Sequence, residues 1–186
     1  MNIKEIQEKA YNTAIQQGLY SENITDDYCI SKIIEEVYEM VRAYTNNEIA
    51  DREYFEFAIN RKWFKLPFIK AYKKYIKDSV QDEFADILIM IASFAKYRYI
   101  ELTGEIKTLE WKRNFAKHSI QVNALGFAKN ATRTHRKGGI ELTLVERLNF
   151  LYAYVISWAK TMGIDLDYFV NIKLEYNAKR GFKHAN

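Results

Sequence analysis

The sequence predicts an all-α fold, a helical bundle, from three observations. Only 7 Gly and 1 Pro occur among the 186 residues, so few positions interrupt a helix. Apolar residues recur at three- and four-residue spacing in several long stretches, and no run alternates apolar with polar residues as a strand would. The length suits one domain with a sizeable core. We therefore expect residues 1–186 to form a single domain.

Helix start and stop signals organise the first half of the chain. Residues 3–17 predict a short helix that ends near Gly18. A second helix is expected from about Asp26 to Tyr44, with two acidic residues at its N-terminus. A third runs from Ser79 to about Gly104, and Ser79-Val80-Gln81-Asp82 resembles a capping box.

The connecting segments have distinct compositions. Residues 50–77 are aromatic and basic, and Pro67 breaks them into two pieces. Residues 105–140 are also basic and show a less regular pattern, which ends at a pair of glycines. We expect these parts of the chain to contribute helical insertions to the bundle.

Two further helices are predicted near the C-terminus. Thr143-Leu144-Val145-Glu146 forms a second candidate capping box, and it opens a helix that ends at Gly163. Asp165 is placed to cap the last helix, which covers about Leu166–Arg180.

Composition bounds the class of protein. Hydrophobic residues make up 48% and charged residues 28% of the chain, a soluble globular composition. The single cysteine, Cys29, excludes a disulfide framework and a cysteine zinc site. The apolar stretch that starts at Phe84 is interrupted at Asp86 and is far shorter than a membrane span, and the N-terminus has no apolar run, so we expect a cytoplasmic protein without membrane contact. The net charge of +4 permits an anionic ligand without implying nucleic acid.

Four carboxylates are the strongest candidates for chemistry. In helical projection, Glu36 and Glu39 share one edge of the apolar stripe of their helix. Glu83 projects into the apolar sector of the third helix, and Asp86 lies beside it. A buried carboxylate must be protonated, paired or bound to a cation. If the two helices pack together, four acids converge, and an oxygen-only ligand set suits Mg²⁺ or Mn²⁺. Pairing with an Arg or Lys is the alternative.

The last helix carries complementary charge. Lys173, Asn177 and Arg180 stand at i, i+4 and i+7 and share one helix face. Two cations and an amide beside an acidic metal site would form a polyphosphate clamp. Alternatively, both cations merely complement the dipole at the helix C-terminus.

These three groups resemble, in order, the motifs of the all-α nucleoside triphosphate pyrophosphohydrolases, the MazG-like enzymes related to dimeric dUTPases. That family has the pattern ExxE, ExxD and KxxxNxxR, and the matching segments here are Glu36-Val37-Tyr38-Glu39, Glu83-Phe84-Ala85-Asp86 and Lys173-Leu174-Glu175-Tyr176-Asn177-Ala178-Lys179-Arg180. The turn Met162-Gly163-Ile164-Asp165-Leu166-Asp167 also resembles a family flank. The resemblance covers about half of the chain, at 30–44, 79–99 and 160–182.

The resemblance implies a function and a set of roles. It implies Mg²⁺-dependent cleavage of a (d)NTP between the α- and β-phosphates, giving a nucleoside monophosphate and pyrophosphate, in a homodimer or homotetramer. Glu36, Glu39, Glu83 and Asp86 would hold one or more Mg²⁺ ions, with Mn²⁺ as a possible substitute, and the three-residue face of the last helix would hold the phosphates. A water activated by the metal would attack phosphorus in line, and Glu36 is our hypothesis for the base that takes its proton. Neutralising Glu39 or Asp86 should abolish turnover and leave the fold intact or stabilised.

The chain departs from the compact members of that family in two insertions, at about 46–78 and 104–160. Roughly 60 residues separate the ExxD helix from the Gly-Ile-Asp-Leu turn. The first insertion offers Trp63, Phe64 and Phe68 for stacking on a base, with ordinary core packing as the alternative. The insertions leave the bundle connectivity, the oligomer and the base and sugar preference open.

Two other classes of protein are alternatives to this function. A di-iron carboxylate bundle needs Glu-x-x-His pairs, and neither His118, His135 nor His184 lies three residues after a candidate glutamate. A non-catalytic nucleic-acid-binding or regulatory helical protein is favoured only by the basic, glycine-ended loop 129–139. That loop is equally consistent with a solvated connection or a lid that faces the phosphates.

Overall fold

The computed structural model describes residues 2–20, 24–61, 65–103, 115–135 and 141–180. Within these ranges the chain forms α-helices and one 3₁₀ turn, and its only β feature is an isolated bridge between His135 and Glu141. The elements are α1 (Ile3–Gln16), α2 (Asp26–Thr45), α3 (Arg52–Asn60), α4 (Phe68–Tyr75), α5 (Val80–Tyr97), η2 (Phe115–Lys117), α6 (Ile120–Ala131), α7 (Leu144–Thr161) and α8 (Leu166–Lys179). The all-α prediction is confirmed.

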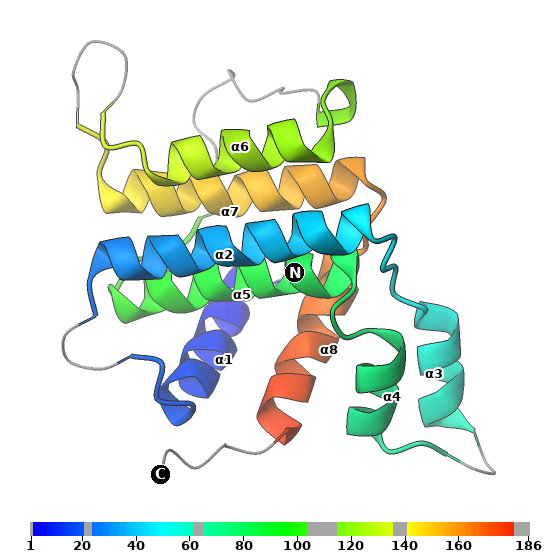
Figure 1. Cartoon of the computed structure of the whole chain (residues 1–186). Coiled ribbons are helices and arrows are strands. Elements are labelled where there is room, and N and C mark those ends of the chain that lie inside the picture. Colours follow the sequence, from blue (N-terminus) through cyan, green and yellow to red (C-terminus); the bar gives the residue numbers. More distant parts are fainter. Residues whose placement is uncertain (1, 21–23, 62–64, 104–114, 136–140, 181–186) are drawn as a thin grey trace.

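Helix α5 is the centre of the bundle. It packs against α1, α2, α7 and α8, and Figure 1 shows α2 lying alongside it, with α6 and α7 on one side and α1 and α8 on the other. Its sequence is apolar nearly all round, and Phe84, Leu88 and Ile91 are fully buried, as expected for a helix enclosed by others. Because α2 and α5 are neighbours, the two acidic motifs face a shared seam.

The C-terminus of α5 differs from the expectation. The helix ends at Tyr97 and not at Gly104. Tyr99 adopts a left-handed φ of 58°, and the Ile100 amide donates to the Ala95 carbonyl over 2.8 Å, which closes the last turn as a Schellman-type cap. The earlier stop leaves residues 98–103 to run back along the bundle, where Gln7 of α1 donates to the Ile100 carbonyl.

The helix caps agree with the sequence in most cases. Thr143 and Glu146 form the complete reciprocal capping box at the start of α7, and Asp165 caps α8 by accepting from the Tyr168 amide. Ser79 caps α5 by accepting from the Asp82 amide. The Asp82 carboxylate does not return to Ser79, because it is engaged elsewhere. The predicted box at Ser79 is therefore only half formed.

Helices α3 and α4 form a hairpin, here called the arm, which projects from one end of the bundle (Figure 1). Backbone bonds close its base: the Asp51 amide donates to the Tyr75 carbonyl (2.8 Å), and the Val80 amide donates to the Glu48 carbonyl (2.9 Å). Arg52 ties α3 to the start of α8, since its guanidinium lies 2.9 Å from the Asp165 carboxylate and 3.7 Å from the Tyr168 ring centre. The first insertion is thus an anchored substructure.

Helix α6 occupies part of the segment for which a less regular structure was expected. It packs against α2 and α7. The Asn123 amide donates to the carbonyls of Phe115 (3.2 Å) and His118 (3.5 Å), and the Tyr154 hydroxyl of α7 donates to the Asn123 carbonyl (2.7 Å). These bonds attach the irregular stretch before α6 to the bundle.

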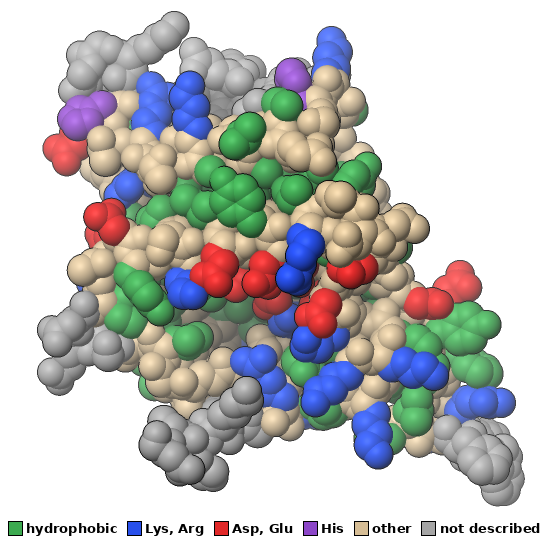
Figure 2. Space-filling view, in the orientation of Figure 1, with side chains coloured by type: hydrophobic (Ala, Val, Ile, Leu, Met, Phe, Trp, Pro, Cys, Tyr) green, Lys and Arg blue, Asp and Glu red, His purple; other side chains and the backbone are tan. Residues whose placement is uncertain are grey.

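Charge is unevenly spread over the surface. Figure 2 shows acidic side chains along the α2–α5 seam and basic side chains gathered directly below them, over α8 and the arm. A band of apolar side chains separates the acidic seam from α6. Within the described ranges, no helix has the length and apolar character needed to cross a membrane.

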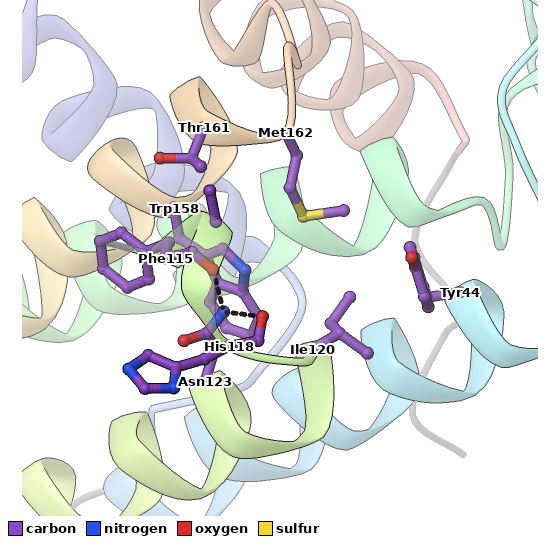
Figure 3. A pocket seen from close by; sticks show the side chains of 9 residues that line it. Tyr44, Phe115, His118, Ile120, Asn123, Trp158, Thr161 and Met162 are labelled. Carbon is purple, nitrogen blue, oxygen red and sulfur yellow. Dashed lines mark hydrogen bonds between the residues drawn. The ribbon is translucent and has the colours of Figure 1, made fainter. Parts of the chain in front are cut away.

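A separate cavity of about 170 Å³ lies between the ends of α2 and α7 and the start of α6 (Figure 3). It is lined by Tyr44, Phe115, Ala116, His118, Ile120, Asn123, Trp158, Thr161 and Met162. None of the four predicted carboxylates borders it, so it is distinct from the acidic seam.

Candidate metal centre

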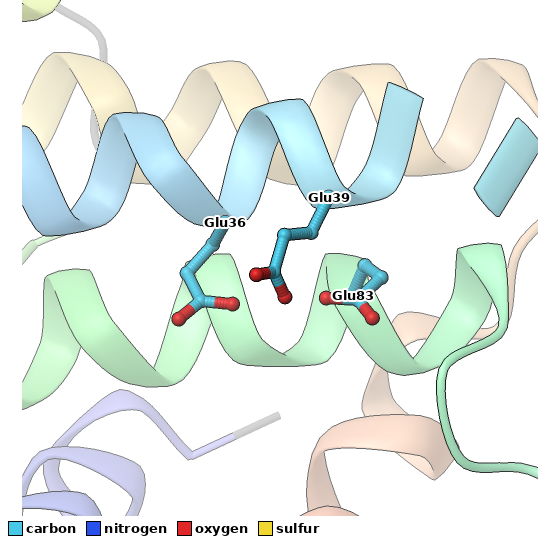
Figure 4. A group of neighbouring side chains, drawn as sticks. All are labelled: Glu36, Glu39 and Glu83. Carbon is cyan, nitrogen blue, oxygen red and sulfur yellow. The ribbon is translucent and has the colours of Figure 1, made fainter. Parts of the chain in front are cut away.

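Three of the four predicted carboxylates converge where α2 faces α5. Glu36 and Glu39 extend from α2 toward α5, and Glu83 meets them from α5 (Figure 4). Each offers one oxygen, and these oxygens all lie within 4.8 Å of one another. The i, i+3 spacing on α2 places its two acids on successive turns of one face, so the seam between the helices closes the group.

Glu83 is the most buried member of the cluster, with 3% of its surface exposed. Its Oε2 atom is buried and makes no hydrogen bond within the described part of the chain. Burial raises the pKa of Glu83 to about 8, and the negative charges of Asp86 and Asp82 add to the effect. A buried carboxyl oxygen without a donor is a position where a cation would be stabilising.

Glu36 is electrostatically coupled to the same group. Burial raises its pKa to about 8, with further contributions from Asp86 and Glu39, while Lys173 opposes the shift. Without a cation, the protein therefore favours the neutral form of both Glu36 and Glu83 at neutral pH. A divalent ion would restore the charged form, since coordination requires a deprotonated carboxylate.

Asp86, the fourth predicted ligand, is engaged differently. Its Oδ2 atom forms an ion pair with Lys173 Nζ. Burial nevertheless raises the pKa of Asp86 to about 6, because the Lys173 charge offsets only part of the desolvation. The Arg or Lys partner considered from the sequence thus exists for this residue. Asp86 stays next to the cluster, as its effect on the pKa values of Glu36 and Glu83 shows.

Lys173 is buried, with 6% of its surface exposed. Besides Asp86, its ammonium contacts Asp82 Oδ1 at 2.9 Å. Burial alone would lower the pKa of Lys173, but Asp86 and Asp82 outweigh burial and raise it. Lys173 is therefore a charged lysine between two aspartates, on the α8 side of the acidic seam.

Asp82 is a residue of the site that the sequence analysis missed. It is 1% exposed and accepts hydrogen bonds from the Tyr72 hydroxyl, the Asp78 amide (2.9 Å) and Lys173 Nζ. Its position in a Ser-x-x-Asp pattern suggested a helix cap. The available signal was its i, i+4 relation to Asp86, which places both carboxylates on one face of α5.

The other two residues of the predicted clamp follow Lys173 along α8. Asn177 is buried, and its Oδ1 atom has no hydrogen-bond partner among the described residues. Arg180 is exposed at the C-cap, and its guanidinium donates over 2.9 Å to Oε1 of Gln17, the residue that follows α1. The predicted shared face is consistent with this arrangement, and the phosphate role of these residues stays a prediction.

Of the three candidates for base stacking, Phe68 lies within the described residues. Trp63 and Phe64 lie outside the described residues. Phe68 is half-buried, makes an edge contact with Phe55 (ring centres 5.6 Å apart) and is covered by Lys179 Nζ at 4.8 Å. These contacts account for Phe68 as packing between the arm and α8. In the basic loop, Lys129 and Arg133–His135 are exposed, and residues 136–140 lie outside the described ranges.

The donor set fits a hard divalent cation. Among the described residues, the group of possible ligands at the seam consists of carboxylates, a chemistry that suits Mg²⁺ or Mn²⁺ better than softer metals. The unpartnered Glu83 oxygen and the raised pKa values of Glu36 and Glu83 indicate a site that a cation would stabilise.

Comparison with known proteins adds no family assignment. No protein-family model, curated protein or solved structure matches the chain.

Proposed function

We propose that this protein is a Mg²⁺-dependent nucleoside triphosphate pyrophosphohydrolase that releases pyrophosphate and a nucleoside monophosphate. The observation that carries the proposal is the convergence of Glu36, Glu39 and Glu83, with an unpartnered buried oxygen on Glu83. A cationic helix face stands directly beside it, with Lys173 buried among acids. The order of the three sequence motifs adds support.

The juxtaposition of the two charge types favours a phosphoanhydride substrate. A carboxylate cluster alone repels a triphosphate, and a basic surface alone offers no means of activating water. The seam supplies the carboxylate cluster, and α8 supplies the basic residues beside it (Figure 2). A ligand that is polyanionic and brings a divalent cation satisfies both, and a nucleoside triphosphate has these properties.

Each residue of the seam and of the α8 face has a proposed role. When bound, Mg²⁺ would supply Lewis-acid chemistry, which offsets phosphate charge and lowers the pKa of a water. Glu36, Glu39 and Glu83 would hold the ion, and Asp86 would join them on exchanging Lys173 for metal. Glu36 is our hypothesis for the carboxylate that accepts the proton of the water, through an oxygen not fully engaged by the ion. Lys173, Asn177 and Arg180 would bind the phosphates and offset charge that develops on the leaving group.

A substrate panel tests the proposal directly. The purified chain is incubated with each common NTP and dNTP in Mg²⁺, and the products are separated by chromatography. We expect pyrophosphate and the monophosphate in equal amounts from at least one nucleotide, and no product from Glu83→Gln. Release of orthophosphate, or no turnover of any nucleotide by the wild-type protein, would overturn the proposal.

The alternative, a non-catalytic nucleic-acid-binding protein, is favoured by one observation. Residues 51–78 contain eight Lys or Arg and four Asp or Glu, so this segment has a net charge of +4, equal to that of the whole chain. Tyr54 and Phe57 of the arm are exposed and could stack on bases. Binding of single-stranded DNA or RNA that weakens steeply with salt, without nucleotide turnover, would favour this function.

A further inference from the structure

Lys173 is held by two carboxylates that have different neighbours. Asp86 is next to the three-carboxylate cluster, so a divalent cation there would compete for it. Asp82 lies one turn earlier on α5 and binds the same ammonium at 2.9 Å. An ammonium has three N–H donors, and two of them are used by these aspartates. Among the described residues the third N–H has no hydrogen-bond acceptor, and it could bind a phosphate oxygen.

Asp82 is itself fixed from two directions. The Asp78 amide donates to one of its oxygens over 2.9 Å, and the Tyr72 hydroxyl donates to the other. At 1% exposure, this carboxylate has little access to water. Its charge is therefore balanced by Lys173 and by these two donors. Because the two donors fix the Asp82 carboxylate, that carboxylate in turn fixes the position of the Lys173 ammonium.

Tyr72 reaches Asp82 from the arm. Its ring stacks on Tyr176 of α8 (ring centres 4.2 Å apart, planes inclined by 12°) and makes an edge contact with Phe55 of α3 (6.2 Å). The side chain is fully buried. Because the base of the arm is closed by backbone bonds, the hydroxyl has a defined location. The arm, which corresponds to the first insertion, thus places a polar group at the edge of the site.

We propose that Asp82 and Tyr72 are positioning residues, which hold the Lys173 ammonium toward the substrate phosphates when Asp86 turns to the metal. This inference rests on the proposed function, and it assigns the first insertion a role at the site. Without Asp82, Asp86 is the remaining aspartate in contact with the buried ammonium. Lys173 would then stay on Asp86, away from the phosphates and in competition with the metal.

A double-mutant cycle tests whether Asp82 acts through Lys173. Wild type, Asp82→Asn, Lys173→Met and the double variant are compared in KM and kcat for the best nucleotide. The same four proteins are compared in calorimetric binding of Mg²⁺·tripolyphosphate, which needs no turnover. We expect Asp82→Asn to weaken binding about tenfold, as for loss of one charge-assisted contact. In the Lys173→Met background the same change should have no further effect.

Tyr72→Phe gives a gentler second cycle if Lys173→Met does not fold. It removes one hydroxyl and should raise KM about threefold, an order-of-magnitude expectation for one neutral hydrogen bond. That effect should vanish in the Asp82→Asn background. Tyr20→Phe is the matched control, since it removes another tyrosine hydroxyl, half-buried and bonded at 2.8 Å to Ser93, seven residues beyond Asp86 on α5. Asp51→Asn controls for the change of Asp to Asn, because Asn can still cap α3.

The outcomes separate the inference from the proposed function. Coupled effects in both assays support both. Coupled tripolyphosphate binding without nucleotide turnover supports the placement of Lys173 and overturns the pyrophosphohydrolase. If the enzyme turns over nucleotide but the effects of Asp82→Asn and Lys173→Met are independent, so that their fold-changes multiply in the double variant, the positioning role alone is overturned. Equal KM changes in Tyr72→Phe and Tyr20→Phe overturn it as well. If wild-type protein does not bind Mg²⁺·tripolyphosphate, both fail.

Discussion

At the residue scale, the two acids of the ExxD motif have different electrostatic situations. Glu83 is buried, and one of its oxygens has no hydrogen-bond partner in the described part of the chain, so its charge destabilises the metal-free fold. Asp86 is paired with Lys173, so its charge balances a buried cation. The sequence shows both as acids on one helix face, and the distinction arises only when α8 packs against α5.

That difference predicts unequal effects of neutralisation. In metal-free protein at pH 9, Glu83→Gln should raise the melting temperature, because it removes an unfavourable buried charge. Asp86→Asn should raise it less, because relief of the buried charge is partly offset when Lys173 loses one of its two carboxylates. The sequence alone suggested that Asp86→Asn would leave the fold intact or stabilised, and the ion pair limits the stabilisation. Thermal melts of both variants in EDTA check the prediction, and a fall for both would contradict the account of Glu83.

The raised pKa values predict how metal-free stability depends on pH. Glu36 and Glu83 have pKa values of about 8 in the folded protein against 4.5 for the ordinary group. The folded state therefore binds more protons than the unfolded state between these values, and stability falls as pH rises from about 4.5 through 8. We expect a falling melting temperature from pH 5 to 9 in EDTA. Glu83→Gln should flatten the slope, and a rising melting temperature over this range would refute the assignment.

At the element scale, strongly patterned helices could be predicted and weakly patterned ones could not. The acidic start of α2, the Thr143 capping box and the Asp165 cap each have a local physical cause that the sequence displays. Helix α6 has a glycine at position 126, and Asn123 is buried in it. Both weaken the local helical signal, so its stability depends on packing against α2 and α7.

The candidate site divides in the same way. Glu36, Glu39 and Glu83 could be predicted because helical periodicity sets which face each occupies. Asp82 and Tyr72 could not, because their contact depends on how the arm folds back on the bundle. Pro67 indicated a break in the arm, yet nothing local shows that the α4 ring at position 72 stacks on α8. Long-range packing supplied the missing information.

Two basic residues at the C-terminal end of α8 allow a role in phosphate binding to be distinguished from stabilisation of the helix dipole. Lys179 and Arg180 are both exposed, and both complement the dipole by at most about 1 kcal/mol. Only Arg180 continues the face of Lys173 and Asn177. We expect Arg180→Ala to lower kcat/KM by about tenfold or more, as for a lost charge-assisted contact. Lys179→Ala, measured in the same assay and by melting, should leave kcat/KM near wild type. Equal losses in the two variants would make this helix end purely structural.

At the scale of the whole molecule, the bundle places acidic side chains and basic side chains on adjacent strips of one face (Figure 2). The acids come from α2 and α5, the bases from α8 and the arm, and α5 contacts α2 and α8 directly. Lys173 of α8 contacts Asp82 and Asp86 of α5 and so connects the two strips. A cation at the seam would compete for Asp86, so metal binding and phosphate binding should be linked through the core of the bundle.

That linkage gives the last prediction, which concerns the stability of the whole protein. A cation that binds only the folded seam stabilises it by RT ln(1 + [L]/Kd), about 1.4 kcal/mol at ten times Kd. For a chain of this size we expect Mg²⁺ or Mn²⁺ to raise the melting temperature by roughly 2–5 °C. The rise should be larger at pH 8.5 than at pH 6, because the raised pKa values of Glu36 and Glu83 make protons compete with the ion. Glu83→Gln should abolish it, whereas Glu56→Gln, on the arm, should not. An equal rise in both variants would show that the ion acts elsewhere on the surface.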